Sequence, residues 1–259
     1  MLSEANIVYQ DRRLVAIDKP AGWLVHRTAI ARQETRFVVQ WLRDRLGRRV
    51  HPVHRLDRAT SGLLLFALDE AAARHLGAQF EAGAVRKTYL AIVRGWPPAE
   101  GRIDHPLKPP ADVYSREATL VRPAVTDYRR LATVELPQAV DRYASARYAL
   151  LALLPLTGRQ HQLRRHLKHI AHPVIGDVRY GKGSHNRFFA SHFDCRRLLL
   201  ASVALAFRHP DGDAPTRLCT PPGDAFAAVL ERLGWLAAAT DAMQTAAIGD
   251  NPLPANDGG

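Results

Sequence analysis

Short hydrophobic runs separated by turn residues recur along most of this chain. In residues 86–94 hydrophobic and polar side chains alternate, so that Lys87, Tyr89 and Val93 share one face of a strand. The strand-like runs are residues 7–9, 14–17, 63–67, 86–94, 126–134, 147–154 and 198–207. The pattern therefore predicts a sheet built from short strands.

Four segments have helical rather than alternating spacing. Residues 37–46 form the first, which ends at Gly47. The second begins after Asp69, a typical N-cap residue, and runs toward Gly83. The other two helical segments are residues 160–170 and 224–233. Because strands outnumber helices and seldom alternate with them, we predict an α+β fold with a mostly antiparallel sheet.

Two segments lack a clear period. Residues 97–123 are rich in proline, which predicts loops and short strands. Residues 237–259 contain no Lys or Arg and end in Gly, Pro and Asn, so we predict a disordered tail. The folded domain is then expected to cover residues 1–236.

Composition points to a polyanionic partner. The chain has 259 residues, of which 47% are hydrophobic, so it can bury a substantial core. Its 36 Lys and Arg outnumber 25 Asp and Glu, which gives a net charge of +11. The excess is concentrated between Pro155 and Leu200, in a window that also holds six of the twelve histidines. Nucleic acid is the first candidate partner, although a solvated basic face would give the same composition.

Other features exclude whole classes of protein. Cys195 and Cys219 have no CxxC spacing, so no disulfide framework is predicted. Residues 1–6 carry an acid and no basic start to an apolar run, unlike a signal peptide. No apolar run approaches the roughly 18 residues that a membrane span requires. We therefore expect a soluble, cytoplasmic protein that does not bind membranes.

The segment His54–Gly62, with the sequence HRLDRATSG, carries the first candidate chemistry. It places Asp57 between Arg55 and Arg58. Fixed positive charge keeps a carboxylate ionised, which suits a nucleophile or a base. A surface turn with an incidental ion pair is the alternative interpretation.

Two further motifs follow along the chain. In Lys87–Gly95, Tyr89 could offer a flat face to a base, or it could be an ordinary core tyrosine. In the predicted helix 160–170, Leu163 and Arg164 are adjacent, about 100° apart around the helix axis. One side chain can therefore pack while the other reaches into a cleft, although an amphipathic helix with a solvated basic face has the same pattern.

Taken together, the motifs HRLDxxTSG, KxYxAxVxG and GRxHQLRxH…PxxGDxxYG resemble those of the pseudouridine synthases of the ribosomal large-subunit synthase A type. The likeness extends over roughly residues 7–210 and includes the opening segment 18–26. It implies the pseudouridine synthase fold, with a mostly antiparallel mixed sheet, flanking helices and a central basic cleft. The small S4-like RNA-binding domain of many relatives is not expected here.

The resemblance also implies roles for individual residues. Asp57 would act at the sugar–base junction of a uridine, with Arg164 paired to it and Tyr89 stacked on the base. Arg55 would help to fill the space of the flipped uridine, and Leu163 would form part of the pocket wall. The further expected substrate-binding residues are Lys87, His54, Arg159 and His161. The reaction involves no redox change or phosphoryl transfer, so neither a cofactor nor a metal is expected.

The substrate is predicted less sharply than the chemistry. Likeness in segments 22–27, 92–96 and 123–126 favours transfer RNA, at position 65, while ribosomal RNA is the runner-up. A monomer is the default expectation. A non-catalytic RNA-binding module is one rival. A metal-dependent hydrolase and a Cys195 nucleophile are others, the former suggested by the histidines His161, His166, His169 and His172.

Overall fold

The computed structural model describes residues 2–26, 36–109 and 120–248. It divides into two compact units. The first unit comprises residues 1–87, 201–223 and 243–259, and the second comprises residues 88–200 and 224–242. No helix within the described ranges is long and apolar enough to cross a membrane.

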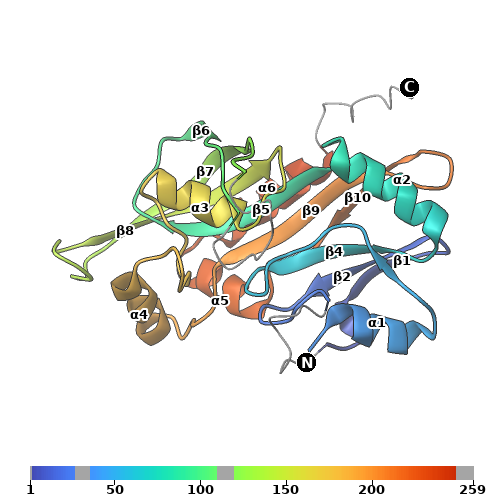
Figure 1. Ribbon diagram of the computed structural model, residues 1–259. Helices are drawn as coiled ribbons and strands as arrows, with labels where there is room; N and C mark the ends of the chain where they lie inside the picture. The colour runs from blue at the N-terminus through green and yellow to red at the C-terminus, as the bar shows by residue number, and fades with distance from the viewer. Residues whose placement is uncertain (1, 27–35, 110–119, 249–259) are drawn as a thin grey trace. The chain divides into compact units, whose positions relative to one another are not determined.

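The first unit is built on a mixed sheet (Figure 1). Its strands are β1 (Ile7–Gln10), β2 (Leu14–Lys19), β3 (His51–Pro52), β4 (Ser61–Ala67), β9 (Leu200–Arg208) and β10 (Pro215–Cys219). Neighbouring strands run antiparallel in the order β1-β2-β4, and β3 also pairs with β4. β4 pairs in parallel with β9, which pairs antiparallel with β10.

Helices of the first unit follow the sequence signals closely. The two predicted ones are α1 (Val38–Leu46) and α2 (Glu70–Glu81), and the unit also has the short 3₁₀ helix η1 (Glu4–Asn6), which was not predicted. Gly47 ends α1 in the left-handed conformation, and the Asp69 carboxylate caps α2 by accepting the Ala72 backbone N–H at 2.8 Å. Leu76 of α2 packs in the core with Leu65 and other buried residues of the sheet. The predicted helix boundaries are thus confirmed here to within a residue or two.

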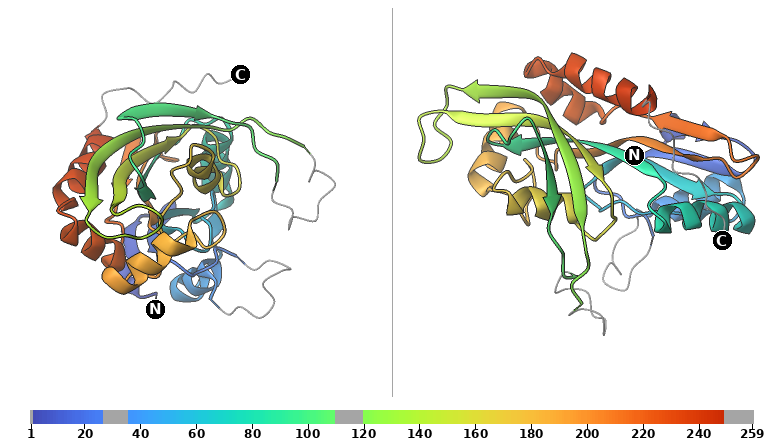
Figure 2. Two further views of the ribbon diagram at one scale, coloured as in Figure 1. Left: turned by 90° about the vertical axis from the view of Figure 1, so that its left-hand side faces the viewer. Right: turned by 90° about the horizontal axis from the view of Figure 1, so that it is seen from above.

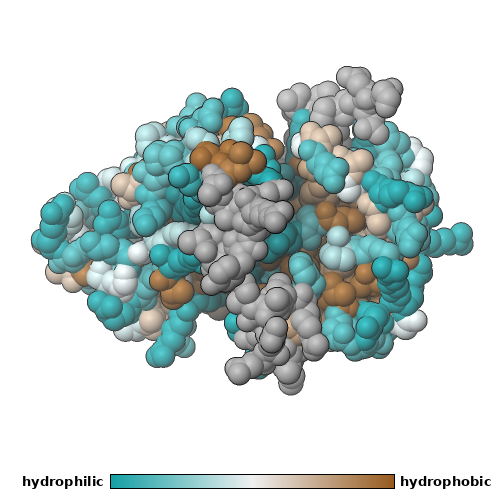
Figure 3. Space-filling view, viewed as in Figure 1, coloured by the Kyte–Doolittle hydropathy of each residue, from teal (hydrophilic) through white to brown (hydrophobic). Residues whose placement is uncertain are grey.

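The second unit has an antiparallel sheet in the order β5-β8-β7-β6. Its elements are β5 (Arg86–Arg94), β6 (Glu100–Asp104), β7 (Val125–Leu136), β8 (Ala146–Pro155), α3 (Gln162–His169), α4 (Gly183–His192) and α5 (Asp224–Arg232). Helix α3 lies on the concave side of the curved strands β7 and β8 (Figure 2). Hydrophilic residues dominate the visible surface around the hairpin that joins β7 to β8 (Figure 3).

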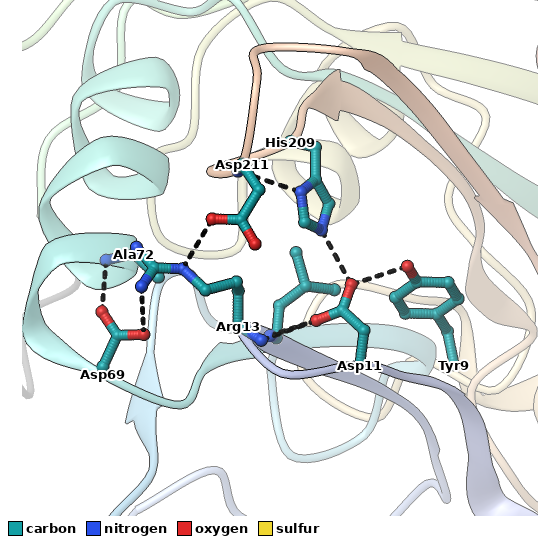
Figure 4. A network of polar contacts seen from close by, with 8 residues as sticks. Tyr9, Asp11, Arg13, Asp69, Ala72, His209 and Asp211 are labelled. Carbon is teal, nitrogen blue, oxygen red and sulfur yellow. Dashed lines mark hydrogen bonds and ion pairs between the residues drawn. The ribbon is translucent and has the colours of Figure 1, made fainter.

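A polar network ties three turns of the first unit together (Figure 4). Arg13, beside the β1–β2 turn, forms ion pairs with Asp69 at 3.1 Å and with Asp211 at 3.2 Å. Asp11 accepts a hydrogen bond from the Tyr9 hydroxyl at 2.6 Å and lies 2.7 Å from Nε2 of His209. Side-chain contacts therefore join the β1–β2 turn, the start of α2 and the β9–β10 turn.

Several elements differ from the sequence-based expectation. The structure adds α4 and β10, which hydrophobic spacing did not predict. It also corrects the predicted tail, because residues Leu236–Ile248 form helix α6. Ala239 and Ala242 of α6 are buried, so small side chains pack this helix, which the absence of Lys and Arg and the Gly-, Pro- and Asn-rich end did not predict. The rest of that tail, residues 249–259, lies outside the described residues.

Candidate active site

Backbone contacts hold the loop that carries Asp57 in the first unit. The Asp57 carbonyl accepts a hydrogen bond from the Thr60 N–H at 3.1 Å. The Gly22 N–H donates to the Arg58 carbonyl at 2.7 Å, and Nε of Arg58 donates to the Gly22 carbonyl at 3.1 Å. Asp57 is half-buried and Arg55 is exposed. The loop is therefore fixed to the Gly22 turn at the residue next to the candidate carboxylate.

Lys19 is a second anchor of this loop. Its side chain is fully buried, and its Nζ donates to the carbonyls of Pro20, Trp23 and Arg58 at 3.0, 3.0 and 3.3 Å. A buried ammonium is tolerated only when its donors find acceptors. Because Arg58 follows Asp57, Lys19 helps to position the candidate carboxylate. Sequence reasoning gave Lys19 no role, although the Lys19-Pro20 turn is part of the family likeness.

Gly62 allows the chain to leave the loop and enter β4. Its φ is +104°, a value that residues with a side chain rarely adopt. A Cβ at this position would lie 2.0 Å from the carbonyl oxygen of Ser202 on β9. Thr60 and Ser61, just before it, are buried. The position therefore requires glycine, and the close approach to β9 fixes this end of the loop.

His54 and Lys87 are half-buried in the first unit. Nε2 of His54 accepts a hydrogen bond from the Leu65 N–H at 2.9 Å, and its ring stacks on Phe80 with centroids 4.7 Å apart. Burial, followed by the charge of Lys87, lowers the pKa of His54 to about 3. Burial also lowers the pKa of Lys87. His54 is thus a neutral, packed ring, and its expected role toward RNA stays a prediction.

Arg164 of α3 forms a buried ion pair with Asp177 in the second unit. Its Nε lies 2.7 Å from Oδ2 and its Nη2 lies 2.8 Å from Oδ1, with 7% of Arg164 and 2% of Asp177 exposed. This two-point contact fixes the plane of the guanidinium. Burial works to raise the pKa of Asp177, but hydrogen bonds from Arg164 and the backbone outweigh it and keep the pKa below its usual range. The pair is therefore charged at neutral pH.

The loop around Asp177 is shaped to hold this carboxylate. The backbone N–H groups of Arg179 and Tyr180 each donate to Oδ1 of Asp177 at 2.9 Å. The Gly181 N–H donates to the Asp177 carbonyl at 3.0 Å, and a Cβ on Gly181 would lie 2.2 Å from that oxygen. The spacing of the GDxxYG motif therefore follows from the turn that surrounds Asp177.

Tyr180 connects the ion pair to His161. Its hydroxyl lies 2.9 Å from Nδ1 of His161, and its ring centroid is 5.1 Å from Cζ of Arg164. His161, just before α3, has a left-handed φ of 56°. Sequence reasoning used Asp177 and Tyr180 only as motif positions and missed their contacts. Their spacing to Gly181 was the available signal.

The remaining expected site residues of the second unit lie on β5 and around α3. Tyr89 is buried on β5 and is paired in register with Leu153 of β8. Leu163 is buried on α3. Nε of Arg159 donates to the Pro123 carbonyl at 3.0 Å. The fold of the second unit therefore gives each of these side chains a fixed place.

The expected site residues fall into two groups. The first unit holds Asp57, Arg55, His54 and Lys87, and the second holds Tyr89, Arg159, His161, Leu163 and Arg164. Within the second unit the structure brings Arg164, Asp177, Tyr180 and His161 together. The pairing of Arg164 with Asp57 stays a prediction.

The structure does not favour the two rival sites, the histidine metal site and the Cys195 nucleophile. The two ring nitrogens of His166 lie 3.0 Å from Oγ1 of Thr126 and 3.0 Å from the His105 carbonyl, so both are engaged within the protein. Among the residues described, no three His, Cys, Asp or Glu side chains are grouped as metal ligands. Cys195, the other rival nucleophile, is buried, and burial raises the pKa of its thiol. Burial disfavours the thiolate that a cysteine nucleophile requires.

Similarities to known proteins show which family of proteins the chain belongs to. Residues 13–169 match the family described as RNA pseudouridylate synthase. The chain is 50% identical over 218 residues to the tRNA pseudouridine synthase C of Pasteurella multocida (strain Pm70), which covers 83% of this chain and 90% of the relative. It is 46% identical over 234 residues to the tRNA pseudouridine synthase C of Vibrio cholerae serotype O1 (strain ATCC 39315 / El Tor Inaba N16961), covering 89% and 96%.

A solved structure agrees with these matches. Human RNA Pseudouridylate Synthase Domain Containing 4 superposes with a TM-score of 0.67 at 28% identity, covering 89% of this chain and 93% of that chain. The chain therefore belongs to the RNA pseudouridylate synthase family. It is an isomerase that acts on RNA, and the predicted α+β pseudouridine synthase fold is confirmed.

Proposed function

We propose that this enzyme converts a uridine of transfer RNA to pseudouridine, at position 65, with Asp57 as the catalytic carboxylate. The observation that carries the substrate is the match to two relatives named for transfer RNA over 83% and 89% of the chain. The HRLDxxTSG segment that holds Asp57 lies within the family match of residues 13–169. Family membership shows that the enzyme acts on RNA, whereas the choice of transfer RNA and of position 65 belongs to this proposal.

Asp57 acts where the base is joined to the sugar. In the isomerisation the bond from C1′ of the ribose to N1 of uracil breaks and a bond from C1′ to C5 forms. The proton on C5 is lost and N1 gains one, so no oxidant, reductant or metal is required. An ionised carboxylate can start this exchange by attack on carbon or by removal of a ribose proton.

Arg164 pairs with the Asp57 carboxylate when the substrate is bound. Its Nε and Nη2 are both oriented by Asp177, so the guanidinium is fixed before any substrate arrives. The guanidinium charge then lies beside the Asp57 carboxylate in a pocket from which the RNA has displaced water. Asp177 is therefore a positioning residue that acts through Arg164.

Tyr89 stacks on the uracil and takes part in the proton movement at C5, and Leu163 lines the base pocket. Both are buried in the second unit, as a pocket for a flipped base requires. Arg55 is exposed and can enter the space that the flipped uridine leaves. The further RNA contacts that we propose are His54, Lys87, Arg159 and His161.

The proposed substrate also bears on where the enzyme works and how it associates with RNA. We infer that it works as a monomer in the cytoplasm, where it meets transfer RNA. Its net charge of +11 favours association with the RNA backbone. Flipping the uridine costs a few kcal/mol, which stacking and phosphate contacts offset.

The test is a chemical map of pseudouridine in total transfer and ribosomal RNA from a strain that lacks the gene. We expect one transfer RNA signal, at position 65, to disappear. Wild-type protein should restore this signal, and the Asp57→Ala variant should not. A missing ribosomal signal would keep the mechanism but overturn the substrate. If no signal were lost, a non-catalytic RNA-binding role would replace the proposal.

A further inference from the structure

A cavity of about 590 Å³ lies within the second unit, where β5 ends and β8 begins. Its walls include Arg94 and Gly95, residues 141–143 and 145–147 of the β7–β8 hairpin and its following strand, and Lys182 and His185. This volume is in the range of about 300–1,000 Å³ that is typical of ligand pockets. Tyr89 lies five residues from Arg94 on β5, so it is about 17 Å away along the strand. The cavity is therefore separate from the place proposed for the target uracil.

The walls of this cavity, called here the basic pocket, carry an excess of positive charge. Arg94, Arg142, Arg147 and Lys182 line it, with Asp141 as the single carboxylate among its lining residues. Lys182 pairs with Asp141 at 2.8 Å, and Arg147 pairs outside the pocket with Glu135 at 3.1 Å.

Two arginines account for the remaining charge. Among the described residues, neither Arg94 nor Arg142 has an ion pair with a carboxylate within 4.0 Å. Nη2 of Arg94 donates to the Ala171 carbonyl at 3.5 Å, and the charge of Arg94 is one of those that lower the pKa of Asp141. These two guanidinium groups therefore leave the basic pocket suited to an anion.

Arg94 is held on a rigid part of the fold. Its N–H donates to the Pro173 carbonyl at 3.1 Å, and its carbonyl lies 2.8 Å from Nδ1 of His172. The next residue, Gly95, donates its N–H to the Arg147 carbonyl at 2.7 Å. A Cβ on Gly95 would come within 2.9 Å of Nδ1 of His172, so glycine makes this packing possible. The guanidinium is thus presented from a fixed backbone, which lowers the entropy lost when a ligand binds.

His185, a lining residue of the basic pocket, is polar but neutral. His185 is buried, and its Nδ1 lies 2.9 Å from the hydroxyl of Tyr148, which is also buried. Burial, followed by the charge of Arg94, lowers the pKa of His185. Burial raises the pKa of Tyr148. Neither ring adds a charge at neutral pH, so attraction of an anion comes from the arginines.

Aromatic rings accompany two of these arginines. Cζ of Arg142 lies 5.0 Å from the centroid of Tyr143, and Cζ of Arg147 lies 4.5 Å from the centroid of Trp96. Tyr143 is 61% exposed and Trp96 is 38% exposed. Exposed rings beside guanidinium groups suit a nucleotide, because the base can stack while the phosphate meets the charge.

We propose that the basic pocket binds a nucleoside phosphate, with its phosphate between Arg94 and Arg142. The substrate RNA supplies it, through a nucleotide other than the target uridine. The RNA source rests on the function proposed above, whereas the phosphate chemistry does not. A free nucleotide has the same chemistry, so the experiment separates these two sources.

The experiment compares the double variant Arg94→Gln/Arg142→Gln with the wild type. Its control is Arg12→Gln/Arg74→Gln, which removes the same charge from exposed positions of the first unit. Binding of a transfer RNA transcript is measured at several salt concentrations, and single-turnover isomerisation is measured at saturating RNA. Calorimetry with uridine 5′-monophosphate tests the free nucleotide.

We expect the pocket variant to raise the Kd for RNA about ten- to hundredfold, because charged hydrogen bonds are lost. The slope of log Kd against log salt should fall by about 0.7 to 0.9 for each phosphate contact removed. The isomerisation rate at saturation and the control variant should stay close to wild type.

Other results would reassign the phosphate site or overturn it. Loss of uridine monophosphate binding with no change for RNA would support the phosphate site and assign it to a free nucleotide. An unchanged Kd and salt slope, together with unchanged nucleotide binding, would overturn the proposal. If the wild type bound RNA through these arginines but formed no pseudouridine in transfer RNA, the proposed function would fail while the pocket stood.

Discussion

Different contacts hold the Asp57 loop of the first unit and the Arg164–Asp177 pair of the second. The loop is fastened through neighbouring backbone positions, at Lys19, Gly22 and Gly62, and Asp57 itself is half-buried. In the second unit both charged side chains are buried and their contact is part of the packed interior. A change of side chain at Asp57 should therefore affect chemistry far more than stability, whereas a change at Arg164 should affect both.

The largest effect on activity is expected from Asp57→Asn. Loss of the catalytic carboxylate should reduce turnover on the order of 10⁴-fold or more, as removal of a nucleophile does in other enzymes. The Kd for RNA and the free energy of unfolding should stay near wild type. Single-turnover assays, RNA binding and urea unfolding measure the three quantities. Turnover near wild type would remove Asp57 from the mechanism, and a large loss of stability would break the comparison.

Arg164→Lys should have the next largest effect, although the charge is kept. A lysine ammonium cannot make the two parallel contacts that the guanidinium makes with Asp177. We expect turnover to fall roughly a hundredfold, on the scale of a 1 Å misplacement of a catalytic group. Stability should fall as well, which urea unfolding would show.

Arg165→Lys is the matched control for this variant. Arg165 follows Arg164 on α3 and donates to the Lys108 carbonyl rather than to a carboxylate. Its replacement should leave turnover and stability close to wild type. Equal behaviour of the two variants would show that the Asp177 contact does not orient Arg164 for the reaction.

Lys19→Met tests whether Lys19 holds the Asp57 loop in place. The substitution removes the buried donor to three carbonyls, which should lower the free energy of unfolding by about 3 kcal/mol. Because the Arg58 carbonyl loses this anchor, turnover should also fall, by about tenfold. Replacement of the exposed Lys168 by Met should change stability by less than about 0.5 kcal/mol. A stable, fully active Lys19→Met protein would show that Lys19 does not position the loop.

The smallest expected effect is a pH dependence of stability that arises from Asp177. Its pKa is depressed in the folded protein, so its contribution is present above the unfolded value of about 4 and is lost as pH falls through the folded pKa. The free energy of unfolding should therefore decrease on acidification below about pH 4. This decrease should be shallower in Asp177→Asn, which lacks the titrating carboxylate. Parallel pH profiles would contradict the depressed pKa.

Local signals explain why much of the fold could be predicted. Asp69 and Gly83 bracket α2 because capping and left-handed turns involve residues only a few positions apart. Alternation in residues 86–94 identified β5 for a similar reason. The helix Leu236–Ile248 was missed, because its small side chains gain stability only through packing that the sequence does not display.

For the candidate site, too, the sequence predicted the features that depend on neighbouring residues and missed those that depend on distant ones. Asp57 and its flanking arginines are adjacent in the chain, so the sequence by itself determined that an acid would sit among positive charges. Only the tertiary structure decided which carboxylate orients Arg164, because Asp177 comes from a loop beyond the end of α3. It likewise brought Lys19 to the carbonyl of Arg58, 39 positions along the chain. Dihedral preferences and caps act between near neighbours, whereas buried charges take their partners from whichever distant segments the packed core brings within reach.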